Sequence, residues 1–167
     1  MKKAVTLFLL IISLHSIAQN KPLRTFPDLE NRLDTHFPIE NFKDQKGENY
    51  SANYLKGKTT LINLWFTTCE PCLKEIPTLN KLKKSVGSKV NFIGITPDSE
   101  EKVNQFLLKH EFDFKQITGA DQQLKQLFVV QRYPTSFIID KNGIIKEITG
   151  IVTEEKLDSI EKMLNEF

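Results

Sequence analysis

The feature that most constrains the fold is an apolar stretch followed closely by two cysteines and a helical repeat. Residues 59–66 read Thr-Thr-Leu-Ile-Asn-Leu-Trp-Phe, and such a β-branched and aromatic run is typical of a strand buried on both faces. Cys69 and Cys72 come next, and apolar residues then recur at steps of three and four, at Leu73, Ile76, Leu79, Leu82 and Val86. The pattern predicts a buried strand that leads into an amphipathic helix, which we expect to end at Gly87.

Runs with strand character recur along the rest of the chain. We expect a short edge strand at residues 38–42 and further strands at residues 90–95, 112–117, 136–139 and 144–148. Asn142-Gly143, between the last two strands, is a strong signal for a hairpin. These last two strands are therefore expected to pair antiparallel to each other.

Helical segments alternate with these strands. We expect one helix after Ser99, a short one over residues 121–128, and a last amphipathic one after Thr153, with Ser99 and Thr153 as caps. Strands that alternate with helices pair in parallel, whereas a closing hairpin is antiparallel. The sequence therefore predicts an α/β fold with a mixed central sheet and helices on both faces.

The first eighteen residues have the three-part pattern of a secretory signal. Lys2 and Lys3 give a basic start, residues 4–12 are apolar apart from Thr6, and small residues stand at Ser16 and Ala18, where a signal peptidase cleaves. The apolar stretch is short for a membrane span, which needs about 20 residues. We expect cleavage before Gln19 and a periplasmic or otherwise exported protein, with an uncleaved membrane anchor as the alternative.

The remaining sequence is expected to form one domain. Residues 19–36 are polar and read as an irregular lead-in, and the regular pattern covers residues 37–167. The full chain has 23 Lys and Arg against 21 Asp and Glu, and residues 1–18 hold two lysines and no acid, so 21 of each remain. A chain without a net positive field has no global attraction for nucleic acid. We expect no nucleic-acid partner, and we expect a monomer.

The cysteine pair points to redox chemistry. A helix N-terminus carries partial positive charge, which stabilises a thiolate, and the thiolate is the reactive form of cysteine. Cys69 lies at the outer end of the predicted helix, so we expect it to be the nucleophile. Cys72, one turn further in, is expected to resolve the mixed disulfide. This chemistry needs no bound cofactor beyond the redox-active disulfide itself.

The cysteine pair has two alternative interpretations. A zinc site needs about four ligands, and after the leader the chain offers two cysteines with only His36 and His110, neither near the pair. No metal site is therefore expected. A static structural disulfide across two residues would close a very small loop and stabilise little.

Two motifs resemble one known family. Residues 61–77, Leu-Ile-Asn-Leu-Trp-Phe-Thr-Thr-Cys-Glu-Pro-Cys-Leu-Lys-Glu-Ile-Pro, are similar to the active-site segment of the TlpA/ResA-like branch of the thioredoxin superfamily. Residues 133–140, Tyr-Pro-Thr-Ser-Phe-Ile-Ile-Asp, with Asn142-Gly143 after them, resemble its second signature. The resemblance implies a thioredoxin-like fold from about Phe37 to the C-terminus and thiol–disulfide oxidoreductase activity.

The resemblance also implies roles for residues around the pair. Pro134 matches a proline that is cis and lies opposite the cysteines, which would put the Tyr133 backbone where a substrate strand pairs; an ordinary trans proline is the alternative. Pro77 matches a proline that kinks the active-site helix. The expected substrate contacts are Tyr133, Pro134, Trp65, Glu70 and Pro71. The carboxylate of Glu70 should disfavour the Cys69 thiolate.

Glu75 matches an acidic residue that ResA-like proteins place near their cysteines. A buried carboxylate there would take and return protons as the thiols react, and the alternative is an exposed helix charge. Asn63 stands where thioredoxin itself has a buried aspartate, and Thr68 replaces a tryptophan common before the first cysteine. The departure at Asn63 fits the TlpA/ResA-like branch and argues against a general thioredoxin. The departure at Thr68 alters the rim that faces the substrate and leaves the identity of the partner open.

The resemblance implies a direction and a setting for the reaction. Such proteins are most often reductants that take electrons from a membrane thiol-reducing partner and reduce disulfides in exported proteins, such as apocytochromes c awaiting haem. One alternative is a peroxide-reducing redoxin, which needs a threonine three positions before its reactive cysteine, where this chain has Phe66. Another is a Sco-type copper carrier, which has three residues between its cysteines and a distant histidine.

Overall fold

The computed structural model describes residues 26–128 and 131–167. The predicted signal sequence and its cleavage site therefore lie outside the described residues. Within the described part of the chain, no helix is both long and apolar enough to cross a membrane.

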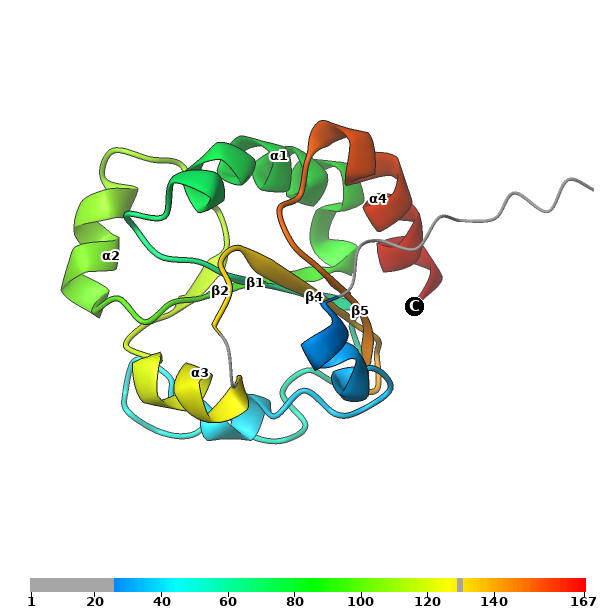
Figure 1. Cartoon of the computed structure of the whole chain (residues 1–167), viewed down its shortest axis with the longest axis horizontal. Coiled ribbons are helices and arrows are strands. Elements are labelled where there is room, and N and C mark those ends of the chain that lie inside the picture. Colours follow the sequence, from blue (N-terminus) through cyan, green and yellow to red (C-terminus); the bar gives the residue numbers. More distant parts are fainter. Residues whose placement is uncertain (1–25, 129–130) are drawn as a thin grey trace, which may run out of the picture.

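The centre of the domain is a five-stranded mixed sheet in the order β3-β2-β1-β4-β5 (Figure 1). Its parallel half is β1 with β2 and β2 with β3, and its antiparallel half is β1 with β4 and β4 with β5. The strands are β1 Thr60–Leu64, β2 Asn91–Ile95, β3 Lys115–Ile117, β4 Thr135–Ile139 and β5 Ile145–Thr149. The predicted mixed sheet with a closing hairpin is confirmed.

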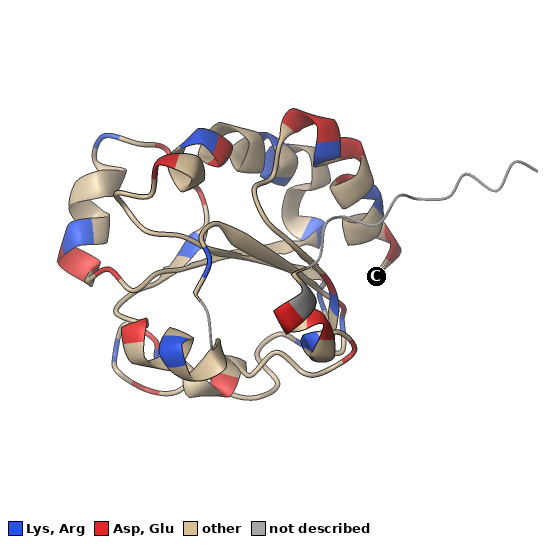
Figure 2. Ribbon diagram, in the orientation of Figure 1, with Lys and Arg blue, Asp and Glu red and all other residues tan. Residues whose placement is uncertain are grey.

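Helices cover both faces of this sheet (Figure 1). One face carries α1, α2 and α4, and the other carries α3 with the 3-10 helices η1 and η2. The helices are α1 Glu70–Val86, α2 Glu100–Leu107, α3 Asp121–Leu127, α4 Leu157–Glu166, η1 Pro27–Arg32, η2 Ile39–Asn41, η3 Gly87–Lys89 and η4 Glu154–Lys156. Figure 2 shows that charged residues of both signs gather on these helices and loops, whereas the central strands are largely uncharged.

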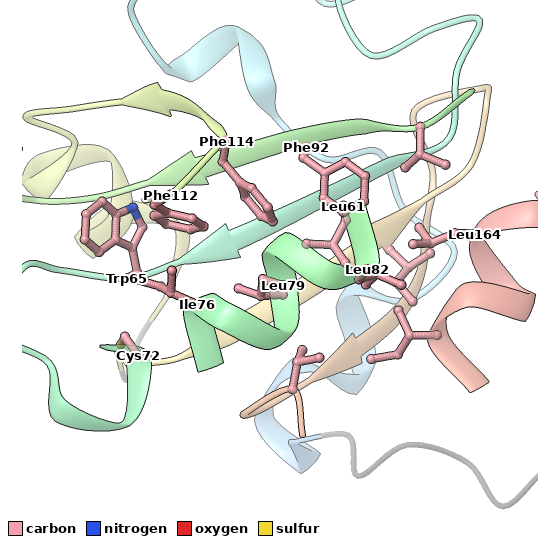
Figure 3. Close-up of a cluster of buried hydrophobic side chains, with 14 of the residues drawn as sticks. Leu61, Trp65, Cys72, Ile76, Leu79, Leu82, Phe92, Phe112, Phe114 and Leu164 are labelled. Atoms are coloured by element: carbon pink, nitrogen blue, oxygen red, sulfur yellow. The ribbon is translucent and has the colours of Figure 1, made fainter. Parts of the chain in front are cut away.

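Two hydrophobic clusters fill the space on either side of the sheet. Successive residues of a strand point to opposite faces, so Leu61 joins the cluster under α1 while Ile62 and Leu64 join the other. The cluster under α1 includes Trp65, which lies near Ile76 at the end of the cluster that leads to the cysteines (Figure 3). Asn63 shares its strand face with Leu61, which places a buried amide under α1.

Several element ends follow the predicted signals. Gly87 ends α1 with a φ of 62°, a conformation that favours glycine. The Ser99 hydroxyl accepts a hydrogen bond from the Lys102 N–H at the start of α2. In the β4–β5 hairpin, one Asp140 oxygen accepts from the N–H groups of Asn142 and Ile144.

One expected strand and one expected helix cap are wrong. Residues 38–42 do not form an edge strand, because the N–H of Phe42 bonds to the carbonyl of Ile39 in η2, and both side chains are buried under the sheet. Thr153 does not cap α4 with its side chain; its carbonyl accepts from Lys156 N–H in η4, and α4 begins after that turn.

The segment before Phe37 contacts the sheet. The Asp34 N–H donates to the Ile145 carbonyl and the Ile145 N–H donates to the Thr35 carbonyl, each at 2.9 Å. Leu29 in η1 is buried in the second cluster. Residues 26–36 therefore cover the outer edge of β5, which would otherwise present unpaired backbone groups.

Candidate active site

Cys69 and Cys72 form a disulfide at the N-terminus of α1. Cys69 is the N-cap residue, and its sulfur accepts a hydrogen bond from the Cys72 N–H at 3.3 Å. Cys69 is 4 % exposed and Cys72 is 0 % exposed. Cys69 is therefore the member of the pair that retains contact with solvent, as the nucleophile must, and Cys72 is enclosed.

A short turn carries the chain from β1 to this helix. The Trp65 N–H extends the pairing with β2 by donating to the Ile95 carbonyl, and the Cys69 N–H donates to the Phe66 carbonyl. The Asp98 carboxylate accepts from both the N–H and the hydroxyl of Thr67, at 2.7 and 2.8 Å. One carboxylate from the end of β2 thus fixes the turn that presents Cys69.

Asp98 stays ionised in this position. Burial opposes its charge, but hydrogen bonds from Lys102 and Thr67 outweigh burial and lower the pKa of the Asp98 carboxyl. Asp98 is not among the site residues expected from the sequence. Its position just after the second parallel strand was the available signal, because parallel strands bring their carboxyl ends to one edge of a sheet.

The Tyr133–Pro134 peptide bond is cis, as the resemblance implied. Thr135, the next residue, pairs with Leu64 at the end of β1, so Pro134 lies at the same edge of the sheet as the turn to Cys69. The Tyr133 ring packs edge-on against Phe66, with centroids 5.1 Å apart. The second signature is therefore brought beside the cysteine turn.

A hollow of about 560 Å³ opens next to Pro134. Three of the five expected substrate contacts line it together, namely Pro71, Tyr133 and Pro134. The hollow is completed by Phe26, Arg132, Gly150, Ile151 and Lys156. A partner segment lying there would pass beside the N-terminus of α1.

The other two expected contacts lie elsewhere. Glu70 is exposed and forms an ion pair with Lys74 at 2.7 Å, which lowers the pKa of the Glu70 carboxyl. Trp65 is fully buried, and its indole N–H donates to the Gln116 side chain at 2.9 Å. The position of Trp65 does not support a substrate contact, because its side chain has no exposed surface for a partner to touch.

Glu75 is buried one turn beyond Cys72. Glu75 is only 1 % exposed, so it is not the exposed helix charge that was the alternative. Glu75 Oε1 accepts from Asn63 Nδ2 at 2.8 Å, and Oε2 accepts from the Val152 N–H at 2.7 Å. Burial raises the pKa of Glu75 to about 7, although these hydrogen bonds and the charge of Lys156 oppose the rise.

Asn63 completes the polar cluster around Glu75. Its Nδ2 also donates to the Ser136 hydroxyl at 3.0 Å, so β1, β4 and α1 are joined through one amide. Its Oδ1 has no hydrogen-bond partner among the described residues. A carboxyl group with a pKa of about 7, enclosed one helical turn beyond Cys72, is suited to hold a proton in one redox state and release it in the other.

Pro77 lies inside α1, five residues after Cys72. A proline has no N–H, so it removes one helical hydrogen bond at this point. Elsewhere, His36 bonds to Glu40 and His110 stacks on Phe106. Over residues 26–128 and 131–167, no group of three or more His, Cys, Asp or Glu side chains is placed to hold a metal ion.

Comparison with known proteins decides the family. The sequence model of the AhpC/TSA family matches residues 26–148. The chain belongs to the AhpC/TSA family. Two relatives carry the comparison further, the thioredoxin-like protein YneN of Bacillus subtilis (strain 168) and the thiol-disulfide oxidoreductase ResA of Bacillus thuringiensis subsp. konkukian (strain 97-27).

YneN is 30% identical over 126 residues, which cover 72% of this chain and 74% of YneN. ResA is 32% identical over 140 residues, which cover 81% of each chain. Among solved structures, the thioredoxin domain of a thiol-disulfide oxidoreductase from Bacteroides vulgatus matches with a TM-score of 0.67 at 22% identity, over 80% of this chain and 98% of that one.

These matches confirm the ResA-like resemblance and the thioredoxin-like fold. This AhpC/TSA family member is a thiol–disulfide oxidoreductase with a Cys69–Cys72 pair.

Proposed function

We propose that the protein acts outside the cytoplasm as a reductant of disulfides in exported proteins. The observation that carries this proposal is the Cys69–Cys72 disulfide at the N-terminus of α1, with the buried Glu75 carboxylate one turn beyond Cys72. A reductant must store two electrons as a dithiol and must manage the protons that go with them. A carboxyl group that titrates near neutral pH beside the inner cysteine supplies that function.

The reaction consists of two thiol–disulfide exchanges. The Cys69 thiolate attacks one sulfur of a substrate disulfide, and the other substrate sulfur leaves as a thiolate that takes up a proton. The Cys72 thiol gives its proton to Glu75 and attacks the Cys69 sulfur of the mixed disulfide. The substrate leaves reduced, and the Cys69–Cys72 disulfide remains. Two electrons have moved from the pair to the substrate, and no bound cofactor takes part.

The return step needs a dithiol donor. The donor reduces the Cys69–Cys72 disulfide by the same exchange in reverse, and Glu75 returns its proton to the Cys72 sulfur. The signal-like sequence at residues 1–18 supports an exported setting, where the donor is a membrane thiol-reducing transporter. The ResA-like resemblance supports exported proteins as substrates, including apocytochromes c before haem attachment.

The redox state of the pair in intact cells tests the direction. Cells that export the protein are quenched with acid and treated with a thiol-alkylating mass tag, and the Cys69→Ser/Cys72→Ser double variant serves as the untagged control. A mostly tagged, reduced pair supports the reductant. A mostly untagged pair overturns it in favour of an oxidase.

A peroxide-reducing activity is the second candidate, because the AhpC/TSA model covers most of the described chain. Phe66 stands where that chemistry needs a hydroxyl close to the reactive thiolate, and its ring is packed on Tyr133. Reduced protein mixed with micromolar hydrogen peroxide distinguishes the two. Slow thiol loss fits disulfide exchange, and rapid stoichiometric loss would establish a peroxidase.

A further inference from the structure

A hydrogen-bonded chain runs from a lysine in the hollow to the buried carboxylate. Lys156 Nζ donates to the Ile151 carbonyl at 2.7 Å, and the Val152 N–H donates to Glu75 Oε2, also at 2.7 Å. The Ile151 carbonyl and the Val152 N–H belong to the same peptide group. One peptide therefore accepts from a cation on one side and donates to a carboxylate on the other.

Lys156 differs from the lysines on the helix surfaces. It is the last residue of η4, is half-buried, and lines the hollow with Pro71 and Pro134. A second hydrogen bond, to the Thr149 hydroxyl at 3.2 Å, holds the ammonium over the end of β5. Lys156 forms no ion pair within the described ranges. Its charge therefore acts on the loop and on Glu75 without a nearer carboxylate to neutralise it.

We propose that Lys156 is a positioning residue that sets the protonation of Glu75 through the Ile151–Val152 peptide group. A cation on a carbonyl oxygen polarises the amide and strengthens its N–H as a donor. The same positive charge favours the ionised carboxylate over the neutral acid. The hydrogen-bonded chain from Lys156 therefore opposes burial, which favours the protonated acid. The proton of Glu75 remains exchangeable near neutral pH. Its significance for the exchange reaction rests on the proposed function.

Other charged groups around this pair have their own partners. From η4, Glu154 binds the Thr78 hydroxyl and Lys81. Across the hollow, Arg132 is paired with Asp28. Glu147 shares a strand face with Thr149 and accepts from the Ile148 N–H.

The remaining contacts of Glu75 are uncharged. β1 contributes the Asn63 amide, and the Ser136 hydroxyl of β4 lies behind it. From α1 itself, Cys72 is in the disulfide. Lys156 is therefore the group whose charge acts on the Glu75 carboxyl. Two effects act on Lys156 itself. Burial lowers the pKa of its ammonium, and the smaller effect of the Glu75 charge raises it.

The titration of Glu75 in the oxidised protein tests the inference directly. The side-chain carboxyl ¹³C signal is assigned by its absence in Glu75→Gln and followed against pH in Lys156→Met and Lys156→Arg. We expect Lys156→Met to move the midpoint upward by about half a pH unit or more, and Lys156→Arg to restore it toward the wild type. Lys162→Met, which removes an exposed α4 lysine paired with Glu166, is the matched control and should leave the midpoint unchanged.

An unchanged midpoint in Lys156→Met overturns the inference, and so does a Lys156→Arg midpoint as high as that of Lys156→Met. If Lys156→Met does not fold, Lys156→Gln, which keeps an N–H donor without the charge, carries the same test. The titration uses the disulfide form and needs no substrate. Its result is therefore independent of the cellular redox state that tests the reductant function.

Discussion

Asn63 donates a hydrogen bond to Glu75 across 2.8 Å, from the middle strand of the sheet to the helix that begins with the cysteine pair. The Asn63 amide donates to the Glu75 carboxylate, whose ionised form burial would otherwise destabilise. It also carries no charge of its own. Asn63 and Glu75 together therefore hold a single negative charge when Glu75 is ionised, and none when Glu75 is protonated.

Asn63→Asp tests this arrangement. The substitution replaces the donor with a second buried carboxylate, so the two acids repel each other whenever both are ionised. We expect a loss of about 2 kcal/mol or more in the free energy of unfolding at pH 8, and a smaller loss at pH 5.5. Urea denaturation at the two pH values measures the difference. An equal loss at both would show that repulsion with Glu75 is not the cause.

Glu75 should also make the stability of the wild-type protein depend on pH. Its folded pKa of about 7 lies above the ordinary value of 4.5. The native state therefore holds a proton that the unfolded state has lost between these values, and stability falls as pH rises through this window. The full effect is on the order of 3 kcal/mol between pH 4.5 and pH 7.

Glu75→Gln removes this titration, so we expect a flatter profile over the same window, measured by urea denaturation of the disulfide form at half-unit steps. Glu70→Gln is the control, because Glu70 is exposed and forms a surface ion pair with Lys74. A Glu75→Gln profile as steep as the wild type would place the titrating group elsewhere.

The parts of the fold predicted from sequence are those with local causes. The β1 strand is a continuous apolar run, α1 has a stripe of apolar residues and ends at Gly87, and the β4–β5 turn carries its own Asp140 hydrogen bonds. The failure at residues 38–42 is also local. Phe37 and Ile39 alternate like a strand, but Phe42 closes a 3-10 turn onto Ile39.

The parts of the site that the sequence left open depend on distant contacts. The resemblance implied a buried Glu75, with an exposed helix charge as the alternative, and the contact that distinguishes the two is the hydrogen bond from the Val152 N–H, 77 residues away, to its carboxylate. Asp98 acts on Thr67, 31 residues before it. Trp65 looked like part of the active-site rim because of its neighbours in sequence, whereas aromatic packing against Phe106 and Phe112 encloses it.

The cysteines should have distinct roles in exchange. Cys69→Ser removes the nucleophile, and we expect it to abolish the reduction of insulin disulfides by dithiothreitol-regenerated protein. Cys72→Ser leaves the nucleophile without its resolving partner, so a mixed disulfide with substrate should accumulate and appear on non-reducing gels. Full activity in both variants would contradict the assignment, and trapping by Cys69→Ser in place of Cys72→Ser would reverse the two roles.

Asp98→Ala should loosen the turn that presents Cys69. The substitution leaves the Thr67 N–H and hydroxyl without their acceptor, and a partly buried donor that loses its partner costs about 1–3 kcal/mol. We expect a loss of that order in the free energy of unfolding, together with a changed alkylation rate for the reduced Cys69. Asp121→Ala is a matched control, because Asp121 also pairs with a lysine four residues later, at the start of α3. If the two variants lose equal stability, the ion pair with Lys102 accounts for the effect and the turn does not. A greater loss in Asp98→Ala assigns the difference to the two Thr67 hydrogen bonds.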